Sequence, residues 1–431
     1  MSTAAGVLSE RDRGRARALG AARLEASLAG VGLAVIALHV LDDSFFQPQP
    51  GTSAGDHLIS GLVPAAVFLG VAAAYPRLRA GLRASLALSL GLLGTVIGGA
   101  EAGYYTLNDR PSGDDYTGFV AVLAGLVLVA VGAVTLWRSR KLNDRRVRRY
   151  ARRLGIAVAA AIVFAFGIFP LSLSYGFTHA ARTVTPSGDL GAPYVSVSFR
   201  TPDGLELKGW YVPSSNRAAV IVFPGKKGTQ KHARMLVRHG YGVLVFDRRG
   251  EGESDGDPNA LGWAFDRDLK GAIGFLQRRG DVDRNRIGGL GLSVGGEALL
   301  QTAAETDALG AVVSEGAGAR SVREDVIRMR VSKVPDIAVS AVLTAGTALF
   351  SNQAPPASLE KLAGEISSPV FYVYATHGAG GEDNNPDYYA ATRSPKQIWK
   401  IDTSHTHGLS ARPEEYERRV VGFFDRTLLH R

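Results

Sequence analysis

The stretch RIGGLGLSVGGEALLQTAAET, residues 286–306, decides the fold. Its first part predicts a short strand, and its second part has the apolar spacing of a helix. Ser293 lies at the junction, between Gly291 and Gly295. A G-x-S-x-G sequence at such a junction permits a sharp turn, because glycine has no Cβ that would clash, and the turn lifts the serine Oγ above the sheet. Ser293 is therefore a candidate nucleophile; the alternative is a glycine-rich turn without a chemical role.

The sequence on both sides of this stretch alternates between strand and helix patterns. Continuous β-branched runs such as AAVIVFPG (218–225) and YGVLVFD (241–247) predict buried strands. Helical spacing is seen at 266–280 and 413–429. Further strands are expected at 194–200, 205–212, 286–293, 310–316, 369–375 and 396–402. Strands that alternate with helices predict a mainly parallel, doubly wound sheet.

The first part of the chain has a different character. It contains five long apolar runs, at 24–41, 58–75, 84–105, 117–137 and 154–177. A helix needs about 20 mostly apolar residues to span a bilayer. The sequence therefore predicts an all-α membrane domain of about five transmembrane helices over 1–180, followed by an α/β domain over 181–431. A signal peptide is not expected, because the opening is long and Arg-rich and further apolar runs follow.

Basic residues are distributed unequally among the connections between these runs. The tail before the first run and the connections after the second and fourth runs are basic, and WRSRKLNDRRVRRYARR alone holds nine Lys or Arg. The alternate connections, 42–57 and 106–116, carry six Asp and only Arg110. By the positive-inside rule the N-terminus is cytoplasmic, which places the C-terminal domain on the extracytoplasmic side. We expect an integral protein of the cell membrane, in contact with the lipid bilayer.

Charge and cysteine content limit the possible functions. The formal net charge is +9, but residues 1–153 hold 18 Lys or Arg against 11 Asp or Glu, so most of the charge lies in the membrane domain. This charge sets the topology, and no nucleic acid is expected as a partner. The chain has no Cys, which excludes disulfides, a thiolate nucleophile and Cys-ligated metals.

Residues 193–431 resemble the α/β-hydrolase family. The resemblance is carried by FPGKKG (223–228), VFDRRGEGESDG (245–256), GLSVGG (291–296) and SHTHGL (404–409) followed by the last helix. One departure is Pro224, where the family usually has His. The resemblance implies an α/β-hydrolase fold, a Ser–acid–His triad in that chain order, and an acyl-enzyme intermediate without a cofactor. By position, the backbone N–H groups of Val294 and Lys226 would form the oxyanion hole.

The resemblance places the triad acid in the loop THGAGGEDNNPDYY (376–389), after the strand at 369–375. The family often has this acid four residues before a proline, which favours Glu382, with Asp383 as the alternative. Weaker candidates for the acid are Asp387 and Glu315, and His377 is a candidate pocket residue.

Two histidines, His405 and His407, follow the last expected strand. The family usually has three or four small residues between this strand and its histidine. Residues 402–404 fill that gap, so His405 is the favoured general base and His407 the alternative. A His-x-His pair can also ligate zinc, but no third ligand is near in sequence, and no metal is expected.

The segment 320–363 lies where the family carries its cap, and we expect a small helical cap there. Its apolar part, 337–350, is too short to span a bilayer. It is expected to roof an acyl pocket, to touch the membrane surface, or to pack as an ordinary helix.

These patterns together predict a membrane-anchored serine hydrolase that cleaves an ester, thioester or amide of a small acyl substrate. One alternative is a peptidase of the same fold, because a triad does not determine specificity. Another is a membrane sensor or binding protein whose hydrolase domain is inactive. The sequence leaves the substrate and the oligomeric state open.

Overall fold

The computed structural model describes residues 10–49, 51–108, 113, 115–139, 146–180, 182, 189–224, 229–322, 324 and 334–430. Contacts divide the chain into two compact units. The first comprises Met1–Pro48 and Ser53–Gly176, and the second comprises Gln49–Thr52 and Phe177–Arg431.

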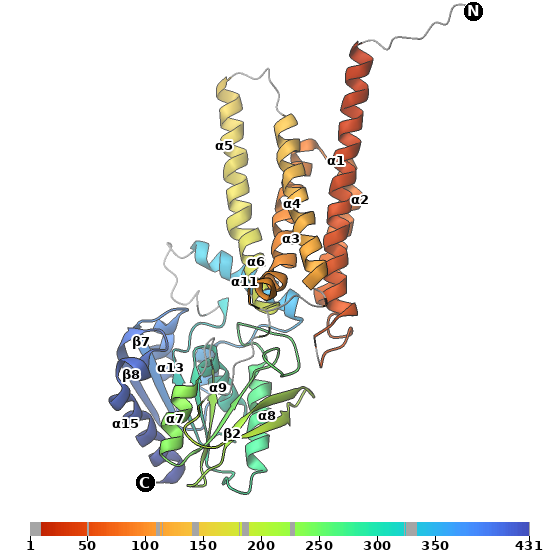
Figure 1. Ribbon diagram of the computed structural model, residues 1–431. Helices are drawn as coiled ribbons and strands as arrows, with labels where there is room; N and C mark the ends of the chain where they lie inside the picture. The colour runs from red at the N-terminus through yellow and green to blue at the C-terminus, as the bar shows by residue number, and fades with distance from the viewer. Residues whose placement is uncertain are drawn as a thin grey trace, which may run out of the picture. The chain divides into compact units, whose positions relative to one another are not determined.

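The first unit is helical. Its helices are α1 (Glu10–Leu41), α2 (Leu58–Ala74), α3 (Ala80–Asn108), α4 (Asp115–Arg138), α5 (Arg146–Val163) and most of α6 (Phe169–Thr178) (Figure 1). A π-helical turn, Phe164–Ile168, joins α5 to α6. Within the described residues, five helical stretches are long and apolar enough to cross a bilayer, by length and composition. Each of the five predicted apolar runs falls within one of them or, for 84–105, within α3.

Small residues let two of these helices pack closely. A Cβ on Gly98 of α3 would lie 2.4 Å from the carbonyl oxygen of Gly118 on α4, and a Cβ on Gly125 would lie 2.6 Å from that of Gly91. Such contacts between glycines are the usual basis of helix association in membranes, where no hydrophobic force drives helices together.

The second unit is built on an eight-stranded sheet in the order β1-β2-β4-β3-β5-β6-β7-β8. The first three strands in that order pair antiparallel, and β4 to β8 pair parallel. The strands are β1 (Val195–Arg200), β2 (Glu206–Val212), β3 (Ala219–Phe223), β4 (Gly242–Phe246), β5 (Ile287–Leu292), β6 (Ala311–Glu315), β7 (Val370–His377) and β8 (Lys396–Ser404). The predicted fold class is confirmed, and each predicted strand is present.

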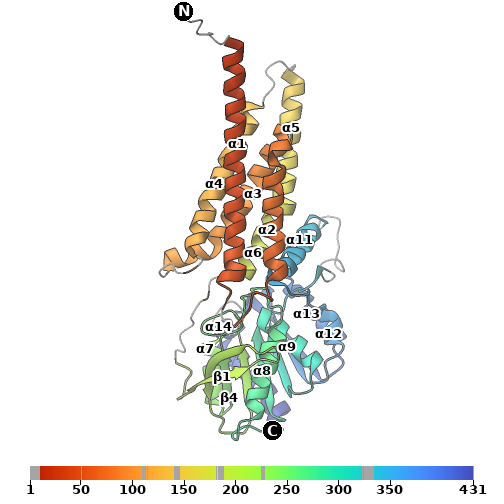
Figure 2. The same cartoon turned by 90° about the vertical axis from the view of Figure 1, so that its right-hand side faces the viewer.

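Helices cover both faces of this sheet (Figures 1 and 2). They are α7 (Gln230–Arg238), α8 (Phe265–Gln277), α9 (Val294–Glu305), α12 (Leu359–Ala363), α13 (Asn385–Ala391) and α15 (Pro413–Phe424). The unit also contains α11 (Val334–Ser351) and the short α14 (Gly408–Ala411). In β3, Ile221 and Phe223 join the core formed with α8, α9, α12 and α13, whereas Val220 and Val222 join the core formed with α7 and α15. The central strands β3, β4, β5 and β6 are buried along their whole length, and β3 and β4 are accordingly continuously apolar in sequence.

Candidate active site

Ser293 lies on a strained turn between β5 and α9. Its φ of 54° and ψ of −126° are unusual for a residue with a side chain. Two glycines make the turn possible by allowing backbone to approach. A Cβ on Gly291 would lie 2.4 Å from the Gly295 carbonyl oxygen, and a Cβ on Gly295 would lie 2.6 Å from that of Phe223. The G-x-S-x-G sequence therefore forms the sharp turn that its glycines predict.

His405 directly follows the described end of β8 and faces this serine. Its Nε2 is 2.9 Å from the Oγ of Ser293, a distance at which one atom donates a hydrogen bond to the other. The side chain is 30% exposed, so the ring lies at the edge of the protein interior. A nucleophile and a base within hydrogen-bond distance are the geometric requirement of nucleophilic catalysis.

Glu382 contacts the other ring nitrogen of the same histidine. Its Oε2 is 2.8 Å from His405 Nδ1, and its Oε1 accepts the backbone N–H of Ala375 over 2.7 Å. Only 1% of the side chain is exposed. The carboxylate can thus hold the imidazole in the tautomer that leaves Nε2 free to accept a proton from Ser293.

The charge of Glu382 also changes the titration of His405. The hydrogen bond to Glu382 raises the pKa of His405 above its ordinary value, and this outweighs the opposing effect of burial. The more distant carboxylates Glu315 and Glu297 act in the same direction. The environment therefore favours the imidazolium, the form that a histidine takes when it accepts a proton from a neighbouring serine.

The structure separates the alternative acids and bases from these three residues. Asp383 is exposed, although it follows Glu382 directly. His407 is exposed as well, and its Nδ1 is 2.7 Å from the backbone oxygen of His405. His377 is 74% exposed and lies 3.5 Å from the carboxylate of Asp402. None of these side chains replaces the contacts among Ser293, His405 and Glu382.

Glu315 has a supporting position that the sequence did not indicate. Its buried carboxylate accepts the backbone N–H of Gly408 over 2.8 Å and the hydroxyl of Tyr416 over 2.5 Å. Burial raises the pKa of Glu315, but the neighbouring His232 and these two donors outweigh it, and the pKa is lowered overall. Glu315 is thus an ionised support for the loop that carries His405.

One of the two expected oxyanion donors lies in the described part of the chain. Val294 is the first residue of α9, where the helix itself does not use the backbone N–H. Lys226 lies outside the described residues, so its contribution stays a prediction.

A cavity of about 490 Å³ opens at Ser293 and His405. Much of its wall is apolar and includes Leu261, Trp263 and Leu343. Leu343 belongs to α11, so the apolar part of the predicted cap lines this cavity. Two charged residues, Glu297 and Arg320, also line it.

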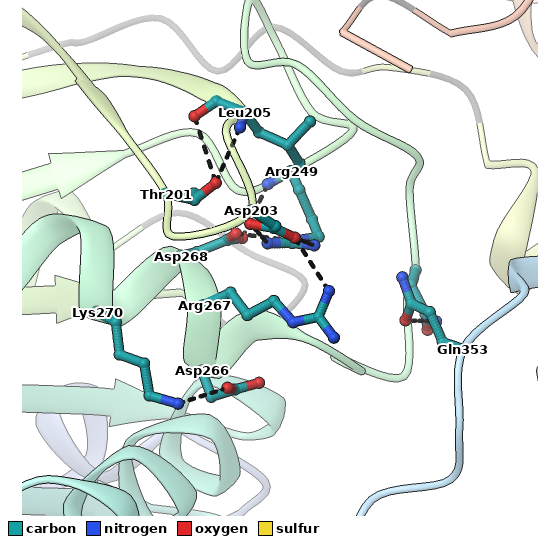
Figure 3. Close-up of polar contacts among 10 residues, drawn as sticks. Thr201, Asp203, Leu205, Arg249, Asp266, Arg267, Asp268, Lys270 and Gln353 are labelled. Carbon is teal, nitrogen blue, oxygen red and sulfur yellow. Dashed lines mark hydrogen bonds and ion pairs between the residues drawn. The ribbon is translucent and has the colours of Figure 1, made fainter. Parts of the chain in front are cut away.

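The connection from β4 to α8, which contains VFDRRGEGESDG, is fixed by a buried ion pair (Figure 3). Arg249 donates its Nε to Asp268 on α8 over 2.7 Å, and its side chain is 4% exposed. The same guanidinium contacts Asp203 in the turn between β1 and β2, at 3.0 Å. Burial raises the pKa of Asp203, but hydrogen bonds and charge from Arg249 outweigh it and lower the pKa. The pair holds the start of a connection whose later residues Ala260, Leu261 and Trp263 line the cavity.

Among the residues with described positions, no three His, Asp or Glu side chains are arranged to hold a metal ion.

Comparison with known proteins agrees with this architecture. The model of the X-Pro dipeptidyl-peptidase (S15) family matches residues 188–407, about half of the chain. The uncharacterized protein YfhR of Salmonella typhi is 28% identical over 253 residues, which cover 56% of this chain and 85% of YfhR. The quorum-quenching protein AidA of Acinetobacter baumannii is 34% identical over 117 residues, which cover 24% of this chain and 38% of AidA.

Among solved structures, an esterase of Pyrococcus furiosus aligns with a TM-score of 0.49 and 22% identity, covering 58% of this chain and 98% of the esterase. The match to the family model includes the strand-to-helix turn at Ser293 and extends to His407. The chain is therefore an α/β-hydrolase that belongs to the X-Pro dipeptidyl-peptidase (S15) family.

Proposed function

We propose that this chain is a membrane-anchored serine hydrolase that cleaves an acyl bond, with Ser293 as nucleophile, His405 as general base and Glu382 as the acid. The observation that carries the proposal is the pair of contacts at His405, 2.9 Å to Ser293 Oγ on one nitrogen and 2.8 Å to Glu382 on the other. Such an arrangement activates a serine that would otherwise be a weak nucleophile.

The reaction proceeds in two halves. Ser293 Oγ attacks the acyl carbon while His405 Nε2 takes its proton, and the resulting imidazolium donates that proton to the departing alcohol, thiol or amine. The product of this half is an ester between Ser293 and the acyl group. Water then attacks this ester with His405 as base, which releases the carboxylic acid and restores the Ser293 hydroxyl.

Negative charge develops on the acyl oxygen in both halves. The N–H groups of Val294 and Lys226 are the donors we assign to that oxygen, from their places next to the nucleophile and after Gly225. One such donor contributes about 3–4 kcal/mol of transition-state stabilisation.

The proposed substrate is a small molecule with an ester, thioester or amide bond. The apolar wall of the cavity suits the acyl part, and α11 would act as the cap over it. The description of the matched family as a peptidase favours an amide, so peptide cleavage is the second candidate activity.

For the membrane part, we infer that residues 1–180 anchor the chain in the cell membrane and that 181–431, with a cap at 320–363, form the hydrolase domain. The basic connections support a cytoplasmic N-terminus and an extracytoplasmic hydrolase. A reporter fused after residue 431 tests this topology. A reporter enzyme that folds and works only outside the cytoplasm should be active when it is fused there. Activity of a reporter that works only in the cytoplasm would refute the assignment.

The activity itself is tested with the full-length protein in detergent. We expect it to hydrolyse p-nitrophenyl esters or aminoacyl p-nitroanilides, and we expect Ser293→Ala to lose that activity. Absence of turnover across a range of acyl groups would instead favour an inactive hydrolase domain in a sensor or binding protein.

A further inference from the structure

Two segments that adjoin candidate membrane spans belong to the hydrolase unit. The first candidate span ends at Phe46 and the fifth ends at Thr178, so four crossings separate the two ends and both lie on the same side of the bilayer. The hydrolase unit includes Gln49–Thr52, which begin three residues after the first span, and it continues from Phe177, the last residue but one of the fifth. With these spans in a bilayer, the covalent chain brings the hydrolase unit to the membrane surface at two points.

The segment after the first span packs on the connection between β4 and α8. Arg182 donates its Nε to the side-chain oxygen of Gln49 over 2.9 Å and its Nη2 to the backbone oxygen of Gly256 over 2.7 Å. A Cβ on Gly51 would lie 2.3 Å from the Cβ of Asp255, so only a glycine fits at this contact. Arg182 and the segment after the first span therefore fix the middle of the connection.

The end of the fifth span fixes a later part of the same connection. The backbone N–H of Ala260 donates to the backbone oxygen of Phe177 over 2.8 Å. Ala260 lines the cavity that opens at Ser293, together with Leu261 and Trp263 of the same connection. One wall of the candidate active site is therefore hydrogen-bonded to the end of the fifth span.

Helix α11, which also lines the cavity, is attached at the same place. Phe350, near the end of α11, makes an edge-to-face contact with His179, with 6.4 Å between the ring centroids. Gln353, just after α11, accepts the side-chain amide of Asn259 over 3.3 Å (Figure 3). α11 is apolar in composition, and its Leu343 lines the cavity. Both elements that supply apolar residues to the cavity are thus fixed next to the end of the fifth span.

These contacts bring the cavity close to the headgroup layer of the bilayer. Phe177 touches the cavity wall directly, and the chain from Phe46 to Gln49 extends by at most about 11 Å. The headgroup layer on each side of the hydrocarbon core is about 5–8 Å thick. The acyl carbonyls of membrane lipids lie in this layer, where the hydrocarbon chains begin.

We propose that the cavity takes its substrate from the bilayer, so that the preferred substrate is a long-chain acyl amphiphile whose ester or amide bond lies at headgroup depth. The inference rests on the proposed function of Ser293 and names the substrate class for it. The acyl chain enters beside the β4–α8 connection and α11, and the polar leaving group stays on the water side. A chain that passes from lipid to an apolar wall does not expose its methylene groups to water, which is the main cost of extracting a lipid. Hydrolysis releases the fatty acid and the alcohol or amine of the headgroup.

The test asks from which bilayer the ester is taken. The full-length protein is reconstituted in vesicles of ether-linked phosphatidylcholine, which has no acyl bond of its own. p-Nitrophenyl stearate is placed either in these vesicles or in separate, protein-free vesicles of the same lipid. We expect hydrolysis to be roughly tenfold faster or more when protein and ester share a bilayer, because a long chain leaves a membrane slowly. p-Nitrophenyl butyrate, which dissolves in water, should be hydrolysed at the same rate whether or not protein-free vesicles are added.

The two esters separate failure of this proposal from failure of the hydrolase assignment. Equal hydrolysis of the stearate from both kinds of vesicle, or hydrolysis of the butyrate without the stearate, overturns the bilayer route and leaves the proposed hydrolase intact. Hydrolysis of neither ester removes the hydrolase proposal and the bilayer route with it.

A variant tests the contact between the connection and the span ends. Arg182→Ala removes the donors to Gln49 and Gly256, and Arg182 does not line the cavity. We expect hydrolysis of the stearate in the shared bilayer to fall roughly fivefold, the effect of about one hydrogen bond, while hydrolysis of the butyrate stays near the wild-type rate. The matched control is Arg267→Ala, at a 51% exposed position, which should keep both rates. Equal losses on both esters in Arg182→Ala would contradict the coupling of the cavity to the span ends.

Discussion

The backbone N–H of Gly408 donates to the carboxylate of Glu315 over 2.8 Å, and this contact ties the loop that carries His405 to the end of β6. The backbone oxygen of the same glutamate accepts the N–H of Ser293 over 2.8 Å. One residue therefore supports both the turn that carries the candidate nucleophile and the loop that carries the candidate base. This explains why a buried glutamate is found at this strand end without contacting either ring nitrogen of His405.

Replacing Glu315 by Ala should destabilise the hydrolase unit. The change leaves two buried donors unpaired, the N–H of Gly408 and the hydroxyl of Tyr416, and each such loss amounts to about 1–3 kcal/mol. Thermal unfolding of the full-length protein, followed by tryptophan fluorescence, should show a lower melting temperature. Glu360→Ala, at an exposed position of α12, is the control and should unfold like the wild type. Equal melting temperatures for the wild type and Glu315→Ala would contradict the supporting role.

The identity of the acid is tested by two neighbouring substitutions. Glu382→Gln should lower kcat by up to roughly 10⁴-fold, because the amide no longer holds the imidazole in the productive tautomer. Asp383→Asn should remain close to the wild type, because Asp383 is exposed. Steady-state kinetics on a p-nitrophenyl ester give both values. The reverse pattern would assign the role to Asp383.

The acidic limb of the pH–rate profile should lie at a higher pH than an unperturbed histidine gives. The pKa of His405 is raised, mainly by its hydrogen bond to Glu382. Because only the neutral imidazole accepts the Ser293 proton, kcat/KM falls as the pH decreases through this raised pKa. The midpoint of this limb should thus lie above about pH 6.5, the ordinary pKa of a histidine.

The same profile can be measured on two variants. Removing the charge at Glu382 lowers the pKa of His405, so in Glu382→Gln the limb should move to lower pH, whereas Asp383→Asn should leave it in place. A limb that does not respond to Glu382→Gln would show that this carboxylate does not govern the titrating group.

The ion pair between Arg249 and Asp268 should be required for stability, because both side chains are buried and water cannot replace a lost partner (Figure 3). Asp268→Ala leaves a guanidinium that is 4% exposed without its closest partner, and breaking a buried pair in this way destabilises by about 3–5 kcal/mol. Arg267→Ala removes a 51% exposed partner of Asp203 and should cost at most about 1 kcal/mol. Unfolding by denaturant gives the loss in free energy of unfolding for each variant. Equal losses for Asp268→Ala and Arg267→Ala would contradict the larger role of the buried pair.

The sequence predicted those features that depend on local pattern. The buried strands β3 and β4 are continuous apolar runs, and the turn at Ser293 is determined by glycines on both sides of one residue. The family's spacing to Pro386 favoured Glu382 over Asp383, but strand and helix patterns could not separate them, because the two lie side by side in the same loop. Their separation depends on the short helical turn after Gly381, whose φ of 88° directs Glu382 into the interior while Asp383 faces solvent.

Contacts between distant segments were not predicted. Arg320 and Gly318 approach Glu297 from the connection after β6, and Gly408 approaches Glu315 from the other end of the unit's sequence. Glu297 follows Ser293 by four residues, but Ser293 precedes α9 with non-helical backbone angles, so spacing alone does not place this carboxylate in the cavity. Its charge environment requires the tertiary structure.

Covalent labelling of Ser293 tests the central proposal most directly. The full-length protein is treated with a fluorophosphonate, digested, and the labelled peptide is identified by mass spectrometry. We predict one adduct on the Ser293 hydroxyl, none in Ser293→Ala, and slower labelling in His405→Ala because the hydroxyl is no longer activated. A label on another residue, or labelling of Ser293→Ala at the wild-type rate, would contradict the assignment of Ser293 as the nucleophile.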